Sequence, residues 1–254
     1  QEYGLFYVYF GGFMKICILN IATNKYIQFV EQLLESVEEN FLNGHDISAL
    51  VFTDHEIEEV SDNVKISQID HEPWPVPTLK RYHYFTKEKE YISQFDYCFY
   101  MDVDMRIVDK VGDEILGDLV ATQHPGMWFK GPDECTYERR PESTAYVPFG
   151  EGEKYYAGGF NGGKPEHFLK MSQTIVDNVE KDWEKGLIAV WHDESHMNRY
   201  LINNPPTLEL NPSYCYPEGA TVDGSPSRYY PAGWKVPFEP KVMALQKNHS
   251  EIRK

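Results

Sequence analysis

The chain has 254 residues, 15% of them aromatic, and a formal net charge of −16 at pH 7. This length allows one sizeable α/β domain, or two small ones that share a core. The acidic balance, with an isoelectric point near 4.9, excludes the broad basic surface that nucleic-acid binding needs. An anionic ligand would therefore require a bound cation or a local group of Lys and Arg side chains.

Strands and helices alternate in the first 105 residues. Apolar runs predict strands, and apolar side chains at helical spacing predict helices. The expected strands are 15–22, 46–54, 64–70 and 95–101, and the expected helices are 24–42 and about 78–93. Such an alternation predicts a parallel sheet, whose ligands bind beyond the carboxyl ends of the strands.

The second half has a different composition. Residues 124–163 are rich in Gly, Pro and aromatic residues, which indicates functional loops. Four of their glycines fall between 158 and 163, where they either let the backbone approach a ligand or form a tight turn. Amphipathic helices are expected over 166–186 and 190–204, and the tail after residue 240 concentrates positive charge.

The N-terminal apolar run does not have the pattern of a targeting or membrane segment. It is interrupted by Lys15, and no basic region precedes it, so we expect neither a signal peptide nor a stable membrane insertion. Residues 1–13 are interpreted as a leader outside the core, with the native segment starting at Met14. The expected location is the cytoplasm.

The four cysteines are scattered and form no C-x-x-C pair, which argues against structural zinc. They are Cys17, Cys98, Cys135 and Cys215. Since Cys17 and Cys98 lie in apolar runs, we expect them to be packed, reduced thiols, which favours a reducing compartment.

Asp102 and Asp104 follow the apolar run 95–101 directly. On an extended segment, side chains two residues apart point to the same face, where two carboxylates repel each other unless a cation lies between them. A divalent cation such as Mn²⁺ or Mg²⁺ suits these hard oxygen ligands. The alternative is a polar strand end exposed to water.

The sequence HDESH at 192–196 offers two further interpretations. His192 and His196 are spaced as zinc ligands on a helix, but the residue after the first histidine is Asp193 instead of the glutamate of the metalloprotease motif. Glu194 could instead stabilise or attack an electron-poor carbon, such as C1 of a sugar. In the simplest alternative, Asp193 and Glu194 only favour the positive N-terminus of a helix.

Several long motifs, in this order, resemble the retaining glycosyltransferases of family six, which include the blood-group A and B transferases and the α-1,3-galactosyltransferases. The motifs are VFTD (51–54), MDVDM (101–105), HPG (124–126), TYERRPESTAYVP (136–148), YYAGGFNGG (155–163), AVWHDESHMNRYL (189–201) and KNHSEIR (247–253). The resemblance runs from about residue 15 to 253. In lacking a stem and an anchor, the given sequence resembles the bacterial or phage members of the family more than its Golgi enzymes. The resemblance implies the Golgi lumen as the location if a stem and anchor have been removed.

The resemblance implies a GT-A-type α/β fold, a Rossmann-like mixed sheet with flanking helices and an acceptor-binding C-terminal half. Residues 14–254 would form one catalytic domain, with 14–105 mainly binding the UDP-sugar and 106–254 mainly supplying acceptor binding, catalysis and a C-terminal lid. By position, Asp102 and Asp104 match the D-x-D motif that holds Mn²⁺ on the donor diphosphate. The implied donor-binding residues are Ile21, Thr23, Tyr26, Arg81, Val103, Ala157, Gly158, Gly159, Lys247 and Arg253.

The same matching assigns catalytic and acceptor roles. Glu194 corresponds to the nucleophile or stabiliser of the sugar cation, and Asp193 to its neighbour on the donor sugar. The implied acceptor-binding residues are His124, Thr136, Trp191 and Glu218. Donor choice in the family turns on residues 157–159, where the small Ala157 and Gly159 favour UDP-GalNAc over UDP-galactose, although a difference of one substituent permits both.

The resulting hypothesis is an Mn²⁺-dependent transfer of GalNAc, or galactose, from a UDP-sugar to the 3-hydroxyl of a β-galactoside, giving an α-1,3 linkage. Two alternatives share most of the site. A non-catalytic carbohydrate-binding module would not need Glu194 together with the aspartate pair, and a UDP-sugar hydrolase would differ only in lacking a productive acceptor.

Overall fold

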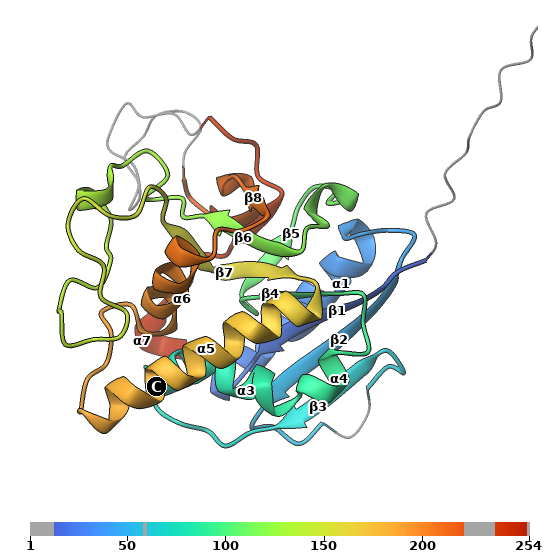
Figure 1. The fold of residues 1–254 in the computed structure, drawn as a ribbon. Coiled ribbons are helices and arrows are strands. Elements are labelled where there is room, and N and C mark those ends of the chain that lie inside the picture. Colours follow the sequence, from blue (N-terminus) through green and yellow to red (C-terminus); the bar gives the residue numbers. More distant parts are fainter. Residues whose placement is uncertain (1–12, 58–59, 221–236, 253–254) are drawn as a thin grey trace, which may run out of the picture.

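A computed structural model describes residues 13–57, 60–220 and 237–252. Its centre is a seven-stranded mixed sheet with the strand order β3-β2-β1-β4-β7-β6-β8. These strands are β1 (Lys15–Ile21), β2 (Asp46–Thr53), β3 (Val64–Gln68), β4 (Tyr97–Met101), β6 (Leu119–Gln123), β7 (Tyr156–Gly163) and β8 (Leu208–Leu210). Helices cover both faces of the sheet (Figure 1). This is the mixed α/β fold expected of a GT-A-type glycosyltransferase.

The first four strands are parallel, as the sequence predicted. Strand β1 lies between β2 and β4, with Ile16 opposite Ile47 on one side and Tyr97 on the other. The side chains of β1 from Ile16 to Leu19 are fully buried, because helices cover both faces. The carboxyl ends of β1 and β4 therefore meet at one edge of the sheet.

Of the two sequence predictions for the glycine-rich segment, the tight turn is wrong. The segment forms β7, a fully buried strand that pairs antiparallel with β4 and β6. A side chain at Gly162 would collide with the carbonyl oxygen of Cys98 and the ring of Phe99 on β4. The missing side chains thus allow a close approach of two backbones in the middle of the sheet, which no periodicity in the sequence indicated.

A second, three-stranded sheet joins the C-terminal segment to the residues that follow β4. Its order is β5-β10-β9, formed by β5 (Met105–Ile107), β10 (Val242–Ala244) and β9 (Tyr216–Pro217). The sequence prediction missed these strands, and β6 and β8 as well, because each has only two to five residues. Short strands carry too little periodicity to be recognised.

The helices follow the predicted ranges with interruptions. The expected helix 24–42 divides into a 3-10 turn η1 and α1, and the expected helix 78–93 divides into three short helices. The helical elements are η1 (Asn24–Phe29), α1 (Val30–Asn40), α2 (Val76–Leu79), α3 (Arg81–Lys87), α4 (Lys89–Ile92), η2 (Asp113–Ile115), η3 (Pro132–Glu134), α5 (Pro165–Glu184), α6 (His192–Asn203), η4 (Pro212–Cys215) and α7 (His249–Ile252). In the part of the chain that the structure describes, no helix combines the length and the apolar character needed to cross a membrane.

Two apolar clusters lie on opposite faces of the sheet. Helix α1 contributes Leu33 and Val37 to one, and helices α3, α5 and α6 cover the other. In Figure 1, α5 runs across this second face in front of the strands. All four cysteines are buried and free, which confirms the expectation for Cys17 and Cys98.

Candidate active site

A cleft of about 530 Å³ opens at the carboxyl ends of β1 and β4. The start of α6 and the C-terminal segment complete its walls. Most of the predicted site residues line this cleft: Ile21, Thr23, Tyr26, Arg81, Asp102, Val103, Asp104, Gly158, Gly159, Trp191, Asp193, Glu194 and Lys247. Residues almost 230 positions apart in the sequence therefore meet in one place.

The other predicted residues do not line the cleft. Ala157 is buried in β7 beside it, and His124, Thr136 and Glu218 lie outside its lining. Arg253 and most of residues 1–13 lie outside the described residues.

The two aspartates of the D-x-D motif are arranged differently from the prediction. Strand β4 ends at Met101, and the amide of Met105 donates to the carbonyl of Asp102 at 3.0 Å, so that Asp102, Val103 and Asp104 form a turn. The expectation of an extended segment with both carboxylates on one face is wrong. Both aspartates nevertheless line the same cleft, because the turn itself faces it.

Asp104 connects this turn to the C-terminal segment. Its side chain is buried and forms an ion pair with Lys247, while its carbonyl accepts the amide of Leu245 at 2.9 Å. The Lys247 ammonium also lies 5.7 Å from the centre of the Tyr26 ring. At the outer end, Lys25 donates to the carbonyl of Glu251 at 2.9 Å. The basic tail thus packs against the cleft at several points.

Arg81 is the buried cation at the base of the cleft. It donates to the carbonyl of Gly158 at 2.7 Å and to Asp102 Oδ1 at 3.2 Å, and it lies 3.3 Å from Asp193 Oδ2. Burial opposes its charge, but the carboxylates of Asp193 and Asp102 raise the pKa of Arg81 above its ordinary value. A permanently charged guanidinium therefore links α3, β7, the D-x-D turn and α6.

Glu194 is held by donors to both of its carboxylate oxygens. The amide of Gly158 donates to Oε2 at 2.8 Å, and the hydroxyl of Tyr155 donates to Oε1 at 2.9 Å. Burial raises the pKa of Glu194, whereas these two hydrogen bonds favour its charged form. A carboxylate oriented in this way can stabilise positive charge at an adjacent atom of a ligand.

Asp193 lies next to Glu194 and is 1% exposed. Neither of its carboxylate oxygens has a hydrogen-bond partner among the described residues, although Arg81 is close enough for an ion pair. Burial, together with the like charges of Glu194 and Asp102, raises the pKa of Asp193 to about 7 despite that arginine. These oxygens are therefore available to accept hydrogen bonds from the hydroxyls of a ligand.

The raised pKa of Asp193 predicts a pH-dependent stability of the protein without metal or donor. Between the ordinary value of 3.8 and about 7, the folded chain keeps a proton that the unfolded chain has released. The free energy of unfolding therefore falls as the pH rises through this range, by at most ~1.4 kcal/mol per pH unit. Urea unfolding of the wild type and of Asp193→Asn at pH 4.5 to 7.5, in EDTA, measures how the free energy of unfolding depends on pH. The wild type should lose stability relative to the variant as pH rises, and a constant difference would contradict the raised pKa.

Two of the predicted acceptor residues, His124 and Thr136, lie next to Tyr155 and outside the cleft lining, whereas Trp191 lines the cleft. The His124 ring packs edge-on against Tyr155, with 5.8 Å between the ring centres, and the Thr136 side chain lies beside the Tyr155 hydroxyl. Glu218 lies elsewhere. Its carboxylate accepts a hydrogen bond from the amide of Gln246 at 2.6 Å, so it contacts the C-terminal segment. Two of these residues therefore reach Glu194 through Tyr155, and Glu218 does not.

Comparison with known proteins assigns the chain to a family. The model of the family described as Glycosyltransferase family 6 matches residues 8–253. The chain belongs to glycosyltransferase family 6. Among curated proteins, it is 34% identical over 242 residues to the Histo-blood group ABO system transferase 1 of Rattus norvegicus, covering 91% of this chain and 66% of the rat protein.

Two further relatives come from different organisms. The Globoside alpha-1,3-N-acetylgalactosaminyltransferase 1 of Homo sapiens is 32% identical over 212 residues, which cover 80% of this chain and 61% of the human protein. The O-antigen biosynthesis glycosyltransferase WbnI of Escherichia coli is 32% identical over 209 residues, which cover 81% of this chain and 89% of that protein. This family 6 chain thus spans less than two thirds of the human and rat proteins' length and most of the bacterial one's.

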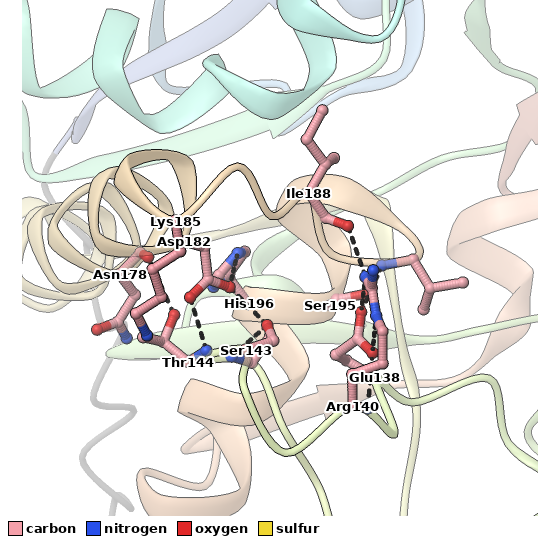
Figure 2. A network of polar contacts seen from close by, with 12 residues as sticks. Glu138, Arg140, Ser143, Thr144, Asn178, Asp182, Lys185, Ile188, Ser195 and His196 are labelled. Carbon is pink, nitrogen blue, oxygen red and sulfur yellow. Dashed lines mark hydrogen bonds and ion pairs between the residues drawn. The ribbon is translucent and has the colours of Figure 1, made fainter.

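Two buried carboxylates hold the loops that precede α6 (Figure 2). Glu138 accepts the amide of Val190 at 2.8 Å and two guanidinium bonds from Arg140, which itself donates to the carbonyl of Ile188 at 2.6 Å. Burial acts against the charge of Glu138, but these bonds lower its pKa to about 2. The segment before Trp191 is therefore fixed by a charged anchor.

The second carboxylate, Asp182 on α5, accepts hydrogen bonds from the neighbouring loop and lies beside α6. It accepts the hydroxyl of Ser143 at 2.5 Å and the amide of Thr144 at 2.8 Å, and His196 Nε2 lies 3.8 Å away (Figure 2). Burial lowers the pKa of His196 to about 4, so that its ring is neutral at pH 7. His196 is buried beside Asp182 and outside the cleft lining, and it therefore does not support the zinc interpretation.

The donor set of the cleft suits a divalent cation shared with a ligand. Within the described residues, no group of three or more His, Cys, Asp or Glu side chains is arranged to hold a metal ion. Asp102 and Asp104 supply two hard carboxylates, and the remaining positions around a Mn²⁺ or Mg²⁺ ion would be open to ligand oxygens and water. The residues present therefore fit a cation that binds together with an anionic ligand.

Ten residues of the cleft lining were not predicted from the sequence. They are Asn24, His71, Glu72, Pro73, Trp74, Pro77, Thr78, Tyr100, His192 and Ile252. Six of them come from residues 71–78, which include the proline-rich run EPWPVP (72–77) between the predicted strand 64–70 and the predicted helix 78–93. The exposed Trp74, whose ring packs edge-on against His192 at 5.2 Å, was the available signal, because a large aromatic residue in a proline-rich turn often marks a ligand rim.

Proposed function

We propose that the chain is a retaining glycosyltransferase that moves GalNAc, or galactose, from a UDP-sugar to the 3-hydroxyl of a β-galactoside, forming an α-1,3 linkage. Family membership supports the coarse part, a nucleotide-sugar donor and a glycan acceptor. The name of the human relative, an alpha-1,3-N-acetylgalactosaminyltransferase, supports the sugar and the linkage. The observation that carries the proposal is Glu194, a half-buried carboxylate oriented by two hydrogen bonds at the wall of a cleft that also holds the D-x-D turn.

The donor diphosphate is proposed to bind at the D-x-D turn. Asp102 and Asp104 would hold Mn²⁺, or Mg²⁺, and the ion would supply positive charge that stabilises the departing UDP. Lys247 would add a second positive charge on the same side, and Tyr26 offers an aromatic surface for the uracil ring. Closure by the C-terminal segment would exclude water that could hydrolyse the donor.

The sugar is proposed to lie between the D-x-D turn and α6. Arg81 and Asp193 would bind its hydroxyls, since both face the cleft and Asp193 has unused acceptor oxygens. Glu194 would stabilise positive charge at C1 on the face opposite UDP, and the acceptor 3-hydroxyl would then attack with retention. Trp191 would form one side of the acceptor position, with His124 and Thr136 acting behind Tyr155.

The preference for UDP-GalNAc is proposed from residues 157–159. Gly158 and Gly159 line the cleft and have no side chains, and Ala157 has a single methyl group. An added side chain at Gly159 would lie 2.8 Å from Asp102 Oδ2 and 2.6 Å from Met105 Cε, so that substitution here would disturb the D-x-D turn. The gain from one N-acetyl group is about 1–3 kcal/mol, which also permits some use of UDP-galactose.

The proposal is tested by UDP release from UDP-GalNAc and UDP-galactose, with and without a β-galactoside acceptor. We expect UDP release to be faster when acceptor is present, and its rate to be higher for UDP-GalNAc than for UDP-galactose. Release should require Mn²⁺ or Mg²⁺, so that EDTA abolishes it. Mass spectrometry and methylation analysis of the product check the added sugar and the α-1,3 linkage.

The contrary outcomes separate the alternatives. Donor binding without release, whatever the acceptor, would favour a carbohydrate-binding module. Release that no acceptor accelerates would favour a UDP-sugar hydrolase. Release that is unaffected by EDTA would contradict the cation site at Asp102 and Asp104.

A further inference from the structure

Tyr100 is a buried residue of the cleft that the proposed mechanism does not use. It lies on β4, two residues before Asp102, and it is 2% exposed. Its hydroxyl donates to Asp102 Oδ1 at 2.6 Å, a length typical of a strong hydrogen bond to a charged carboxylate. Tyr100, which hydrogen-bonds the Asp102 side chain, thus lies on a central strand of the sheet.

Arg81 completes the environment of the same carboxylate oxygen. Its Nη2 donates to Asp102 Oδ1 at 3.2 Å, and its guanidinium carbon lies 4.3 Å from the centre of the Tyr100 ring. Tyr100 therefore contacts both members of the Arg81–Asp102 pair, one through its hydroxyl and the other through its ring face. The ring supports the guanidinium, and the hydroxyl fixes the carboxylate.

The two donors divide the roles of the two carboxylate oxygens. Both are directed at Oδ1, whereas Oδ2 lies over Gly159, within 2.8 Å of the position that a side-chain carbon there would occupy. The Asp102 side chain is 37% exposed, so the carboxylate faces the open cleft and could rotate if Oδ1 were not held. Holding one oxygen fixes the orientation in which the other is presented.

We infer that Tyr100 is a positioning residue that holds Asp102 in the orientation needed to bind the divalent cation together with the donor diphosphate. This inference rests on the proposed function, and it adds a residue to which neither the motif nor the family comparison assigned a role. Residues that hydrogen-bond a metal-binding carboxylate from behind typically contribute 10- to 100-fold to metal affinity. The tyrosine lowers the cost of ordering the carboxylate when the cation and UDP bind.

The test measures UDP affinity by calorimetry, in saturating Mn²⁺ and in EDTA, for the wild type and Tyr100→Phe. This change removes the hydroxyl and keeps the ring under Arg81. We expect the dissociation constant of UDP in Mn²⁺ to rise tenfold or more, and its value in EDTA to stay within about twofold. Tyr97→Phe is the matched control, since Tyr97 lies on the same strand and its ring stacks on Phe99, away from Asp102. It should change neither value.

A double variant separates positioning from folding. In an Asp102→Asn background, Tyr100→Phe should add less than about twofold, because the hydroxyl no longer has a charged partner to orient. Equal UDP affinity of the wild type and Tyr100→Phe in Mn²⁺ would overturn the inference, and so would equal weakening in Mn²⁺ and in EDTA. If Mn²⁺ does not strengthen UDP binding to the wild type, the proposed cation site fails, and the inference fails with it.

Discussion

Replacing Glu194 by glutamine is expected to lower the rate of glycosyl transfer by about 10³-fold, with UDP affinity in Mn²⁺ within about twofold of the wild type. Glutamine keeps the size of the side chain and its acceptor oxygen, so that the amide of Gly158 or the hydroxyl of Tyr155 can still donate to it. What is lost is the negative charge opposite the departing UDP. The variant should therefore separate binding from chemistry.

Glu209→Gln is the matched control for Glu194→Gln. Glu209 also accepts a tyrosine hydroxyl, that of Tyr156 at 2.7 Å, and it lies outside the cleft lining. Its substitution removes one carboxylate from β8 and should leave transfer within about threefold of the wild type, since Glu209 lies outside the cleft lining. Full activity of Glu194→Gln would refute its proposed role, and parallel losses in both variants would indicate a general structural effect.

A chain that ends at Leu245 should have the second largest loss, about 10²-fold in transfer at subsaturating donor. The truncation removes Lys247 from the cleft and from its ion pair with Asp104, and it removes the wall formed by Ile252. Strand β10 and the bond from the amide of Leu245 to Asp104 would remain, so the D-x-D turn should keep its position. Steady-state kinetics with varied UDP-sugar measure the effect.

Lys247→Met and Lys170→Ala resolve the origin of that loss. Lys247→Met removes only the cleft cation, and Lys170 is an exposed cation on α5, away from the cleft lining. Most of the loss should appear in Lys247→Met and none in Lys170→Ala. Unchanged kinetics of the truncated chain would exclude a lid at the C-terminus.

The chemistry of the cleft could be read from motifs that are continuous in the sequence. The aspartates at 102 and 104 and the HDES sequence at 192–195 contain four of the carboxylates that line the cleft, and their type alone pointed to a cation and a sugar carbon. The parallel strands β1 to β4 were predictable for the same reason, because each is a local apolar run. Both inferences depend on neighbours in the chain.

Contacts between segments that are far apart in the sequence determine the other features of the fold and of the cleft. Gly162 and Gly163 fit a central strand because the backbone of β4 and that of Asp118, just before β6, approach them too closely for side chains, a constraint that lies in the partners and not in the segment itself. The D-x-D residues form a turn because β5 pairs with β10, about 137 residues later in the chain. Donors from β4, β7 and α3 orient the carboxylates of Asp102 and Glu194. The sequence by itself thus determined which chemical groups are present, and the tertiary structure decided their orientation, since orientation depends on packing between elements that no local pattern encodes.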